Sequence, residues 1–296
     1  MSHGEGSTTG LRVGVIGLGA MGGPIAGHLL AAGLPVHVLD PDTDAVKRCT
    51  TQGATVAASP AALSAEVDVV LVVVPGDDDA LAVCCEADGV FAGAGPGTAL
   101  LLCSSLRPQT CQQIAAAAGP GVSVLDAALT GGVRGVKAGR VNLLVGGAAE
   151  DLERVRPVLA PWCSSVHHLG ALGAGQVAKT ANNLIHWAQI SAIAEALTLA
   201  AAYGLSVPAL RKALQDGPTD SRTLRELEQM RLTWHVKDLA NAESLAQAVG
   251  VPLPVAQAVR GAMLETSVEG LARLLRTAPV DPYQKKLRND STKGPI

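Results

Sequence analysis

Aromatic residues and clustered charge are scarce in this sequence of 296 residues. It has three Trp, two Tyr and one Phe, and its formal net charge is −3 with no basic run in the body of the chain. The lack of a basic cluster argues against a nucleic-acid-binding protein. Apolar residues make up 48% of the chain and charged residues 17%. We therefore expect a globular protein long enough for one large domain or two ordinary ones.

Paired cysteines and long apolar leaders are also lacking. None of the six cysteines belongs to a C-x-x-C pair, so the sequence supports no metal site and no redox motif. The first ten residues are polar and lack a signal-peptide core, and no stretch stands out as long enough to span a membrane. These absences predict a soluble, cytoplasmic protein with reduced thiols, no metal, and no membrane partner.

What is present in the first half is an alternation of apolar strands with helices. Apolar strands between helices are typical of a parallel sheet covered on both faces. The pattern predicts an α/β N-terminal Rossmann domain, with a mostly parallel doubly wound sheet, over residues 11–172. Its last predicted helix covers 149–159 and is followed by an extended segment at 165–169.

The second half reads as helices alone. A helix predicted over 175–203 is apolar nearly all round, and we expect it to be deeply buried. It joins the Rossmann domain to an all-α C-terminal domain for substrate binding and oligomerisation over 173–278. The termini, 1–10 and 279–296, are expected to be flexible. The other helices predicted in this half are 207–215, 223–230, 236–249, 254–265 and 269–275.

A glycine-rich motif follows the first strand. Gly17, Gly19 and Gly22 form G-x-G-x-x-G, with Ala20 and Met21 between them, and the motif opens a helix. In a βαβ unit the first glycine allows a tight turn, the second lets a pyrophosphate approach the backbone, and the third lets the helix pack closely. Backbone N–H groups at the helix start then hold the phosphates. The motif predicts a dinucleotide site.

Asp40 ends the next strand, 23 residues after Gly17. A carboxylate at this spacing accepts hydrogen bonds from a ribose 2′-OH and repels a 2′-phosphate. No Arg or Lys follows immediately, so the sequence predicts NAD, with NADP less favoured. The alternative is that Asp40 only caps a turn.

The long predicted helix carries a line of polar residues. Lys179, Asn182, Asn183 and His186 are spaced to share one face of an otherwise apolar helix. Polar groups in such surroundings need a partner or a function, and a buried lysine suits proton transfer. The alternative readings are that Lys179 extends to solvent and that His186 is a core residue.

Four motifs in this order are similar to those of the β-hydroxyacid dehydrogenases, which include 3-hydroxyisobutyrate dehydrogenase and tartronate semialdehyde reductase. The first is Gly17-Leu-Gly-Ala-Met-Gly-Gly-Pro-Ile-Ala, and the second Asp126-Ala-Ala-Leu-Thr-Gly-Gly. The third runs from Gly170 to Lys179-Thr-Ala-Asn-Asn, and the fourth is Lys237-Asp-Leu. They cover roughly residues 11–275. The chain therefore resembles this family.

The resemblance implies roles for residues that match the family's motifs. Lys179 would be the catalytic acid/base, Asn183 would orient the substrate, and Lys237 would lie near the nicotinamide. The substrate carboxylate would bind at a glycine-containing loop, which suits an anion on physical grounds as well. That loop is Thr130, Gly131 and Gly132, and the residues lining the cofactor groove would be Val74, Pro75 and Ser105.

Two stretches depart from the family pattern. Thr130 stands where a serine is usual, and Ala128-Leu129 replaces Pro-Val. Before Lys237, residues 230–235 replace the family's Pro-Gly-Phe turn. The resemblance implies that Trp234, which lies in this stretch, borders the substrate site. Packing is the simpler role for Trp234 and for Trp187, and the substrate stays open.

Together these features predict an NAD-dependent 3-hydroxyacid dehydrogenase that forms a homodimer or homotetramer. One alternative is an imine reductase, which usually carries Asp or Tyr at the position of Lys179. Another is a dinucleotide-binding module without catalysis, in which that lysine tends to be lost.

Overall fold

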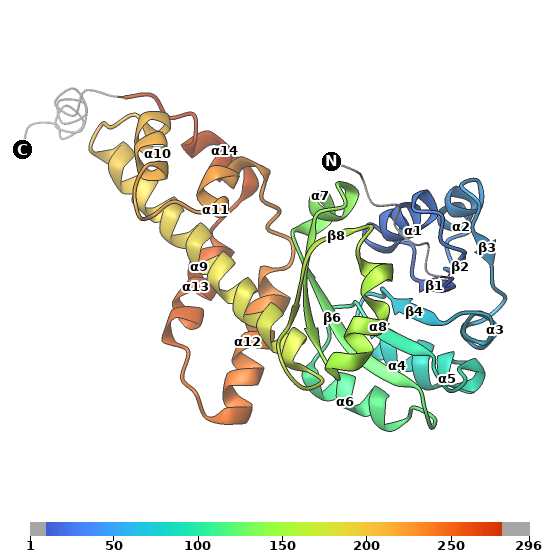
Figure 1. Cartoon of the computed structure of the whole chain (residues 1–296). Coiled ribbons are helices and arrows are strands. Elements are labelled where there is room, and N and C mark those ends of the chain that lie inside the picture. The colour runs from blue at the N-terminus through green and yellow to red at the C-terminus, as the bar shows by residue number, and fades with distance from the viewer. Residues whose placement is uncertain (1–9, 280–296) are drawn as a thin grey trace, which may run out of the picture. The chain divides into compact units, whose positions relative to one another are not determined.

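The computed structural model describes residues 10–279 (Figure 1). They divide after Lys179 into two compact units. The boundaries drawn from the sequence, 11–172 and 173–278, stay a prediction. The termini that we expect to be flexible lie, apart from Gly10 and Pro279, outside the described residues.

The first unit is built on an eight-stranded sheet with the order β3-β2-β1-β4-β5-β6-β7-β8. Neighbouring strands run parallel except for β6 and β7, which are antiparallel. The strands are β1 (Val13–Ile16), β2 (Val36–Leu39), β3 (Thr55–Val56), β4 (Val69–Val72), β5 (Ala99–Leu102), β6 (Ser123–Thr130), β7 (Val141–Gly146) and β8 (Cys163–His168). The helices are α1 (Gly22–Ala31), α2 (Thr43–Thr50), α3 (Pro60–Ala65), α4 (Asp77–Cys85), α5 (Val90–Gly93), α6 (Pro108–Ala116), α7 (Gly132–Lys137) and α8 (Ala149–Leu159).

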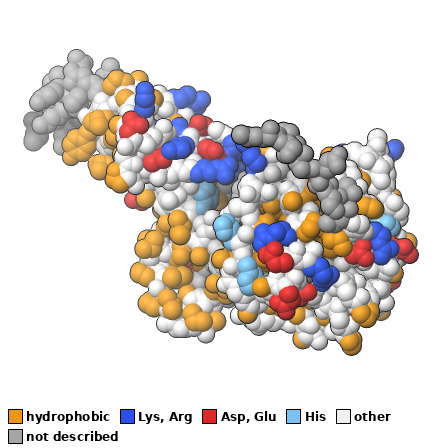
Figure 2. Space-filling view, viewed as in Figure 1, with side chains coloured by type: hydrophobic (Ala, Val, Ile, Leu, Met, Phe, Trp, Pro, Cys, Tyr) orange, Lys and Arg blue, Asp and Glu red, His pale blue; other side chains and the backbone are white. Residues whose placement is uncertain are grey.

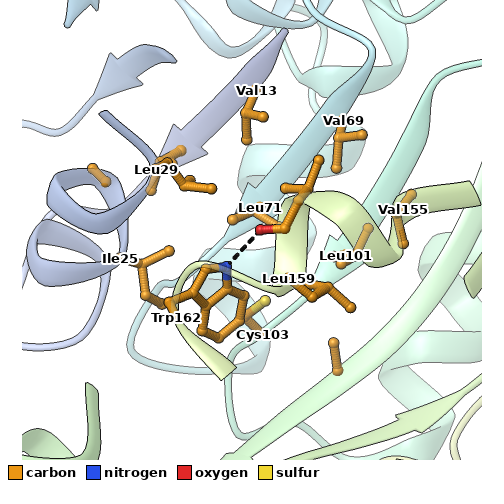
Figure 3. Close-up of a cluster of buried hydrophobic side chains, with 14 of the residues drawn as sticks. Val13, Ile25, Leu29, Val69, Leu71, Leu101, Cys103, Val155, Leu159 and Trp162 are labelled. Carbon is orange, nitrogen blue, oxygen red and sulfur yellow. Dashed lines mark hydrogen bonds between the residues drawn. The ribbon is translucent and has the colours of Figure 1, made fainter. Parts of the chain in front are cut away.

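Both faces of this sheet are covered, which explains its unbroken apolar strands. Along β4, Val69 and Leu71 belong to a core shared with α1, α2 and α8, whereas Val70 and Val72 belong to a second core shared with α3 to α6. Each fully buried Val or Leu stabilises the fold by about 1.5–3 kcal/mol relative to exposure. Figure 3 shows the first core closed by Trp162, whose indole Nε1 donates to the carbonyl of Val158 at 2.9 Å.

The strand order reverses between β1 and β4. The chain proceeds from β1 to β2 and β3 on one side, then returns to place β4 on the other side of β1. Val73, just past β4, donates its N–H to the carbonyl of Ile16 at the end of β1 at 2.8 Å. In doubly wound sheets, ligands bind outside the carboxyl ends of the strands at such a reversal. The Gly17 turn lies at this point.

The second unit is helical. It holds most of α9 (Ala174–Ala202), which begins in the first unit, and a core formed by residues such as Trp187, Ile190 and Leu197 of α9 with Leu239 and Met263. Its other elements are α10 (Val207–Gln215), α11 (Arg222–Arg225), the 3₁₀ turn η1 (Leu227–Gln229), α12 (His235–Val249), α13 (Pro254–Leu264) and α14 (Val268–Leu274). A Rossmann domain followed by an all-α part confirms the predicted fold class.

Two expectations for α9 are wrong. Only 22% of its most apolar 18-residue window is buried, so it is not deeply buried within one chain. The helix is apolar nearly all round, but only the side carrying Trp187, Ile190 and Leu197 reaches the core, while Ile185 and Leu199 are exposed. By length and composition alone α9 could also cross a membrane, with a mean hydropathy of 1.3, contrary to the expectation that no stretch is long enough.

Candidate active site

The three glycines of the G-x-G-x-x-G motif lie in different surroundings, which explain why glycine occupies each position. Gly17 has φ +91, and a Cβ there would lie 2.2 Å from the carbonyl oxygen of Val73. A Cβ on Gly22 would lie 1.8 Å from the carbonyl oxygen of Gly17. A Cβ on Gly19 would meet nothing within 4 Å. The turn itself therefore requires Gly17 and Gly22, whereas the open space at Gly19 fits the close approach of a ligand.

Asp40 holds this turn. One carboxylate oxygen accepts the N–H of Leu18, and the other accepts the N–H of Asp42 at 2.7 Å. Asp40 is half-buried, and an ionised carboxylate has about four lone-pair sites, so two remain for a ribose hydroxyl. The start of α1 has no side-chain cap at Met21, so its N–H groups can receive a phosphate. These residues fit the adenosine and pyrophosphate groups of a dinucleotide.

The loops after β4 and β5 are tied together beside this turn. Val74 donates its N–H to Ser104 Oγ at 2.8 Å, and Ser104 Oγ donates in turn to the carbonyl of Val72 at 3.4 Å. Arg107 donates its N–H to Asp77 Oδ1 at 2.9 Å. The predicted groove residues Val74 and Pro75 follow β4, and Ser105 lies half-buried between Ser104 and α6. Ser104 was not predicted, because a serine after a strand carries no distinctive pattern.

A buried carboxylate joins β6 to the beginning of α9. Asp126 is fully buried, and its oxygens accept the N–H of Gly173 at 2.6 Å and of Gln176 at 2.7 Å. A Cβ on Gly146 or Gly175 would lie 2.3 or 2.7 Å from those oxygens. Burial raises the pKa of Asp126, and the hydrogen bonds from the backbone oppose that rise. Gly146 of β7 and Gly175 of the third motif thus make room for this carboxylate.

The Thr130-Gly131-Gly132 loop runs from the last residue of β6 to the first residue of α7. Gly131 and Gly132 have φ of +107 and +62, which glycine adopts without strain, and α7 has no side-chain cap. Thr130 Oγ1 donates to the carbonyl of Asn142 at 3.2 Å and accepts from Asn142 Nδ2 at 3.0 Å. The hydroxyl is therefore engaged with β7, and the binding of a substrate carboxylate at this loop stays a prediction.

Lys179 lies half-buried on α9, one helical turn beyond Gln176. Asn183 is one turn further and 9% exposed, and its Oδ1 accepts from Asn182 Nδ2 at 3.2 Å. Because residues three and four apart share a helix face, Lys179 and Asn183 project from the same side of α9. Among residues 10–279, no group of three or more His, Cys, Asp or Glu side chains could hold a metal ion.

The altered stretch before Lys237 contacts Trp187 in the second unit through His235. Trp187 is buried, and its indole Nε1 donates to Asp238 Oδ2 at 3.1 Å. His235 meets the Trp187 ring edge-on with ring centroids 5.9 Å apart, and its Nδ1 donates to the carbonyl of Leu232 at 2.6 Å. His235 Nε2 is buried and has no hydrogen-bond partner among the described residues. The packing role expected for Trp187 is therefore confirmed.

Trp234 behaves differently, because 64% of its surface is exposed. The packing role that we favoured for it is wrong within the chain, since no core surrounds the ring. Its role at the substrate stays a prediction, as does that of Lys237, which is half-buried on α12.

Burial raises the pKa of every cysteine thiol in this chain. All six thiols are free, and burial raises the pKa of Cys84 and of Cys163 to about 12. A thiol with so high a pKa is protonated near neutral pH and is a poor nucleophile.

Comparison with known proteins agrees with this geometry. Residues 12–170 match the family model described as the NAD-binding domain of 6-phosphogluconate dehydrogenase, and residues 173–283 match the one described as NAD-binding of NADP-dependent 3-hydroxyisobutyrate dehydrogenase. Curated relatives include a 3-hydroxyisobutyrate dehydrogenase of Pseudomonas aeruginosa, 38% identical over 68% of this chain and 67% of the relative. An NAD-dependent L-serine dehydrogenase of the same organism is 37% identical over 69% of each chain.

Among solved structures, the 3-hydroxyisobutyrate dehydrogenase of Mycobacterium tuberculosis with L-serine matches with a TM-score of 0.78. It is 28% identical, and the match covers 95% of this chain and 100% of that one. The resemblance carried by the four motifs is thereby confirmed, and an NAD(P)-binding unit is present. The chain is a member of the β-hydroxyacid dehydrogenase family.

Proposed function

We propose that this protein is an NAD-dependent dehydrogenase of a small 3-hydroxy acid. The observation that carries the proposal is the arrangement of the first unit. The Gly17 turn follows β1, the Thr130 loop follows from β6, and the start of α9 is bonded to Asp126 of β6, all within one unit whose sheet reverses its strand order between β1 and β4. This arrangement offers a dinucleotide turn, an anion-binding loop and a lysine to one reaction.

Lys179 is proposed as the general acid/base. NAD, when bound, takes up a hydride from the carbinol carbon. The ε-amine of Lys179, in its uncharged form, accepts the hydroxyl proton as the carbonyl forms, and the ammonium returns the proton in the reverse direction. The glycine N–H groups of the Thr130 loop hold the substrate carboxylate, and Asn183 orients the substrate. Lys237 is proposed to contact the cofactor, and Trp234 to border the substrate.

The substrate class follows from chemistry that two named relatives share. 3-Hydroxyisobutyrate and L-serine both carry a primary alcohol on the carbon next to the one that bears the carboxylate, and they differ in the remaining substituent. We propose a 2-substituted 3-hydroxypropanoate, oxidised to its semialdehyde. The departures at Thr130 and in residues 230–235 are the places where the chain differs from the family and where the substituent can be selected.

NAD is proposed over NADP because of Asp40. Its carboxylate would repel a 2′-phosphate, and the next residues, Pro41, Asp42 and Thr43, supply no positive charge. The next basic residues along the chain are Lys47 and Arg48 of α2, and Arg48 lies 4.0 Å from Asp42 Oδ2, which neutralises part of its charge. The description of one matching family model names NADP. The proposed preference for NAD therefore rests on the residues of this chain and not on that family model.

The imine reductase alternative has less support. The lysine retained at position 179 suits proton transfer to a carbonyl oxygen, and the Thr130 loop supplies a place for a carboxylate that an imine substrate does not need. A binding module without catalysis would have no use for either feature.

A homodimer or homotetramer is proposed because exposed apolar surface on the second unit is extensive. Figure 2 shows hydrophobic side chains gathered over α12 and α13, where Val249 and Leu264 are 72% and 66% exposed. On α9, Leu199 and Tyr203 just beyond its end are exposed as well. Surface of this extent on a monomer marks an interaction site. The proposed occupant is a second copy, in a cytoplasmic protein that binds neither nucleic acid nor a membrane.

A substrate panel tests the proposed activity. The purified protein is assayed with NAD and with NADP against 3-hydroxyisobutyrate, L-serine and the amide of 3-hydroxyisobutyrate, by absorbance of the reduced nicotinamide. We expect turnover of an acid with NAD and little turnover of the amide, which lacks the charge that the Thr130 loop binds. Equal turnover of acid and amide would contradict the carboxylate site. The mass in light scattering tests the oligomer, and a monomer would contradict it.

A further inference from the structure

Gln176 makes a two-point contact between α9 and the loop after β5. Its Oε1 accepts the N–H of Leu106 at 3.0 Å, and its Nε2 donates to the carbonyl of Ser104 at 2.8 Å. The side chain is 1% exposed, so water cannot replace either hydrogen bond. A glutamine is required here because one end must accept and the other must donate.

This contact belongs to a chain of hydrogen bonds that begins at the groove and ends in β6. Ser104 Oγ accepts from the N–H of Val74, which follows β4. Gln176 links the backbone of Ser104 to α9, and its own N–H is held by the carboxylate of Asp126. The loops after β4 and β5, the start of α9, and β6 are thereby held together within the first unit.

We propose that Gln176 and Asp126 are positioning residues, which fix the first turn of α9 against the strand-end loops and so set where the Lys179 ε-amine stands relative to a bound nicotinamide. Neither residue transfers a proton. Each acts through Lys179, so the proposal rests on the function proposed for that lysine. The geometry supports it because α9 continues without a break from Gln176 to Lys179, one turn later. A shift of the first turn therefore moves the lysine with it.

Two substitutions at Gln176 separate positioning from folding. Gln176→Met keeps the length and bulk of the side chain but removes both hydrogen bonds. Gln176→Glu keeps both only while the carboxyl is neutral, because a protonated carboxyl has one acceptor and one donor. Burial and the nearby Asp126 carboxylate should raise the pKa of that glutamate above its usual value. Gln189→Met on the same helix, about four turns further, is the matched control.

The first measurement needs no cofactor or substrate. Hydrogen exchange of the free protein should speed up at the amides of Leu106, Gly173 and Gln176 in the Met variant, and stay unchanged in the Gln189→Met control. Unchanged protection at these amides in the Met variant would overturn the proposal, because the contact would then hold nothing in place.

The second measurement is kcat across pH, relative to the wild type, with NAD and the best substrate of the panel. For Gln176→Met we expect kcat to fall on the order of 100-fold, as for a displaced catalytic group. The dissociation constant for NAD should change by no more than about threefold, since the pyrophosphate turn is untouched. Gln176→Glu should approach the wild type at acidic pH and lose activity as pH rises, whereas the Met variant stays low throughout.

Each outcome supports or contradicts the positioning role of Gln176. A Met variant with wild-type kcat, or a Glu variant whose activity relative to the wild type does not change with pH, would overturn the positioning role. A loss of Tm without the pH-dependent rescue would assign Gln176 to folding alone. Lys179→Ala is measured beside them. If it retains activity, the function proposed for Lys179 fails, and if only the Gln176 expectations fail, that function stands.

Discussion

Two carboxylates, Asp40 and Asp126, hold backbone N–H groups in similar ways but in different surroundings. Asp40, after β2, and Asp126, in β6, each accept two backbone N–H groups. Asp40 is half-buried beside the glycine turn, whereas Asp126 is fully buried under the start of α9. Asp40 keeps lone pairs open to a ligand, and Asp126 has none within reach of solvent.

The comparison teaches that hydrogen bonding alone does not distinguish a binding residue from a structural one. Both carboxylates cap backbone N–H groups, so the capping alternative for Asp40 describes real contacts. Exposure decides what each can do beyond that. We expect a change at Asp126 to act on stability, and a change at Asp40 to act on cofactor choice.

Asp126→Asn should have the largest effect on stability. An amide has one accepting oxygen and an NH₂ group that faces a helix N–H, so at least one of the Gly173 and Gln176 N–H groups loses its partner. An unsatisfied buried donor costs about 1–3 kcal/mol. Urea denaturation should therefore show a drop of about 1–3 kcal/mol in the free energy of unfolding. An unchanged free energy of unfolding would remove Asp126 from its structural role.

Changing the cofactor preference comes next in size. Asp40→Ser together with Pro41→Arg removes the repulsion of a 2′-phosphate and adds a positive partner for it. The ratio of kcat/KM for NAD over NADP should fall by roughly 100-fold, the equivalent of one or two charged hydrogen bonds. A wild type that already prefers NADP, or a variant with an unchanged ratio, would contradict the role of Asp40.

Gly19→Ala should weaken NAD binding without weakening the fold. A Cβ at Gly19 meets nothing within 4 Å in the free protein, but it would stand where the pyrophosphate approaches the backbone. We expect the NAD dissociation constant to rise about tenfold, or about 1.4 kcal/mol, with Tm unchanged. Gly22→Ala is the contrasting variant, because its Cβ would lie 1.8 Å from the carbonyl oxygen of Gly17 and the fold itself should lose stability. If the two variants have the same NAD dissociation constant and the same Tm, the different surroundings of Gly19 and Gly22 have no effect, which would contradict this interpretation.

The smallest expected effect is a pH dependence from Asp126. Burial raises its pKa in the folded state, so its contribution to stability is fully present below the ordinary aspartate pKa of about 3.9 and is lost as pH rises through the folded value. The penalty of Asp126→Asn should therefore shrink as pH increases from about 4. A penalty that grows over this range would mean that the backbone N–H groups outweigh burial.

Local patterns predicted much of the fold and part of the site. Periodicity placed α8 and α10 at their observed bounds, and the spacing of Gly17 and Asp40 identified a turn that closes within one βαβ unit. The helix predicted over 223–230 is instead α11 followed by a 3₁₀ turn, because Glu226 leaves helical geometry. These features depend on neighbours in the chain, which explains where pattern reading succeeds.

The remaining features depend on residues far apart in the chain. Gln176 bonds to a loop 70 residues earlier, and Asp126 to N–H groups about 50 residues later, so no local pattern reveals either contact. The exposure of α9 was also missed, since an apolar helix looks the same whether its own chain or another covers it. A glutamine or aspartate inside a glycine-rich motif is the only signal that could have directed attention to this network.

The central claim is that Lys179 is the acid/base of an NAD-dependent hydroxyacid dehydrogenase, and a matched set of lysine variants tests it most directly. In Lys179→Ala and Lys179→Arg, kcat at saturating NAD should fall by about 10²–10⁴-fold, because neither side chain accepts a proton, while the NAD dissociation constant stays near the wild-type value. Lys212→Ala, at an exposed lysine of α10, should keep wild-type kcat. A kcat for Lys179→Ala close to that of Lys212→Ala would contradict the account.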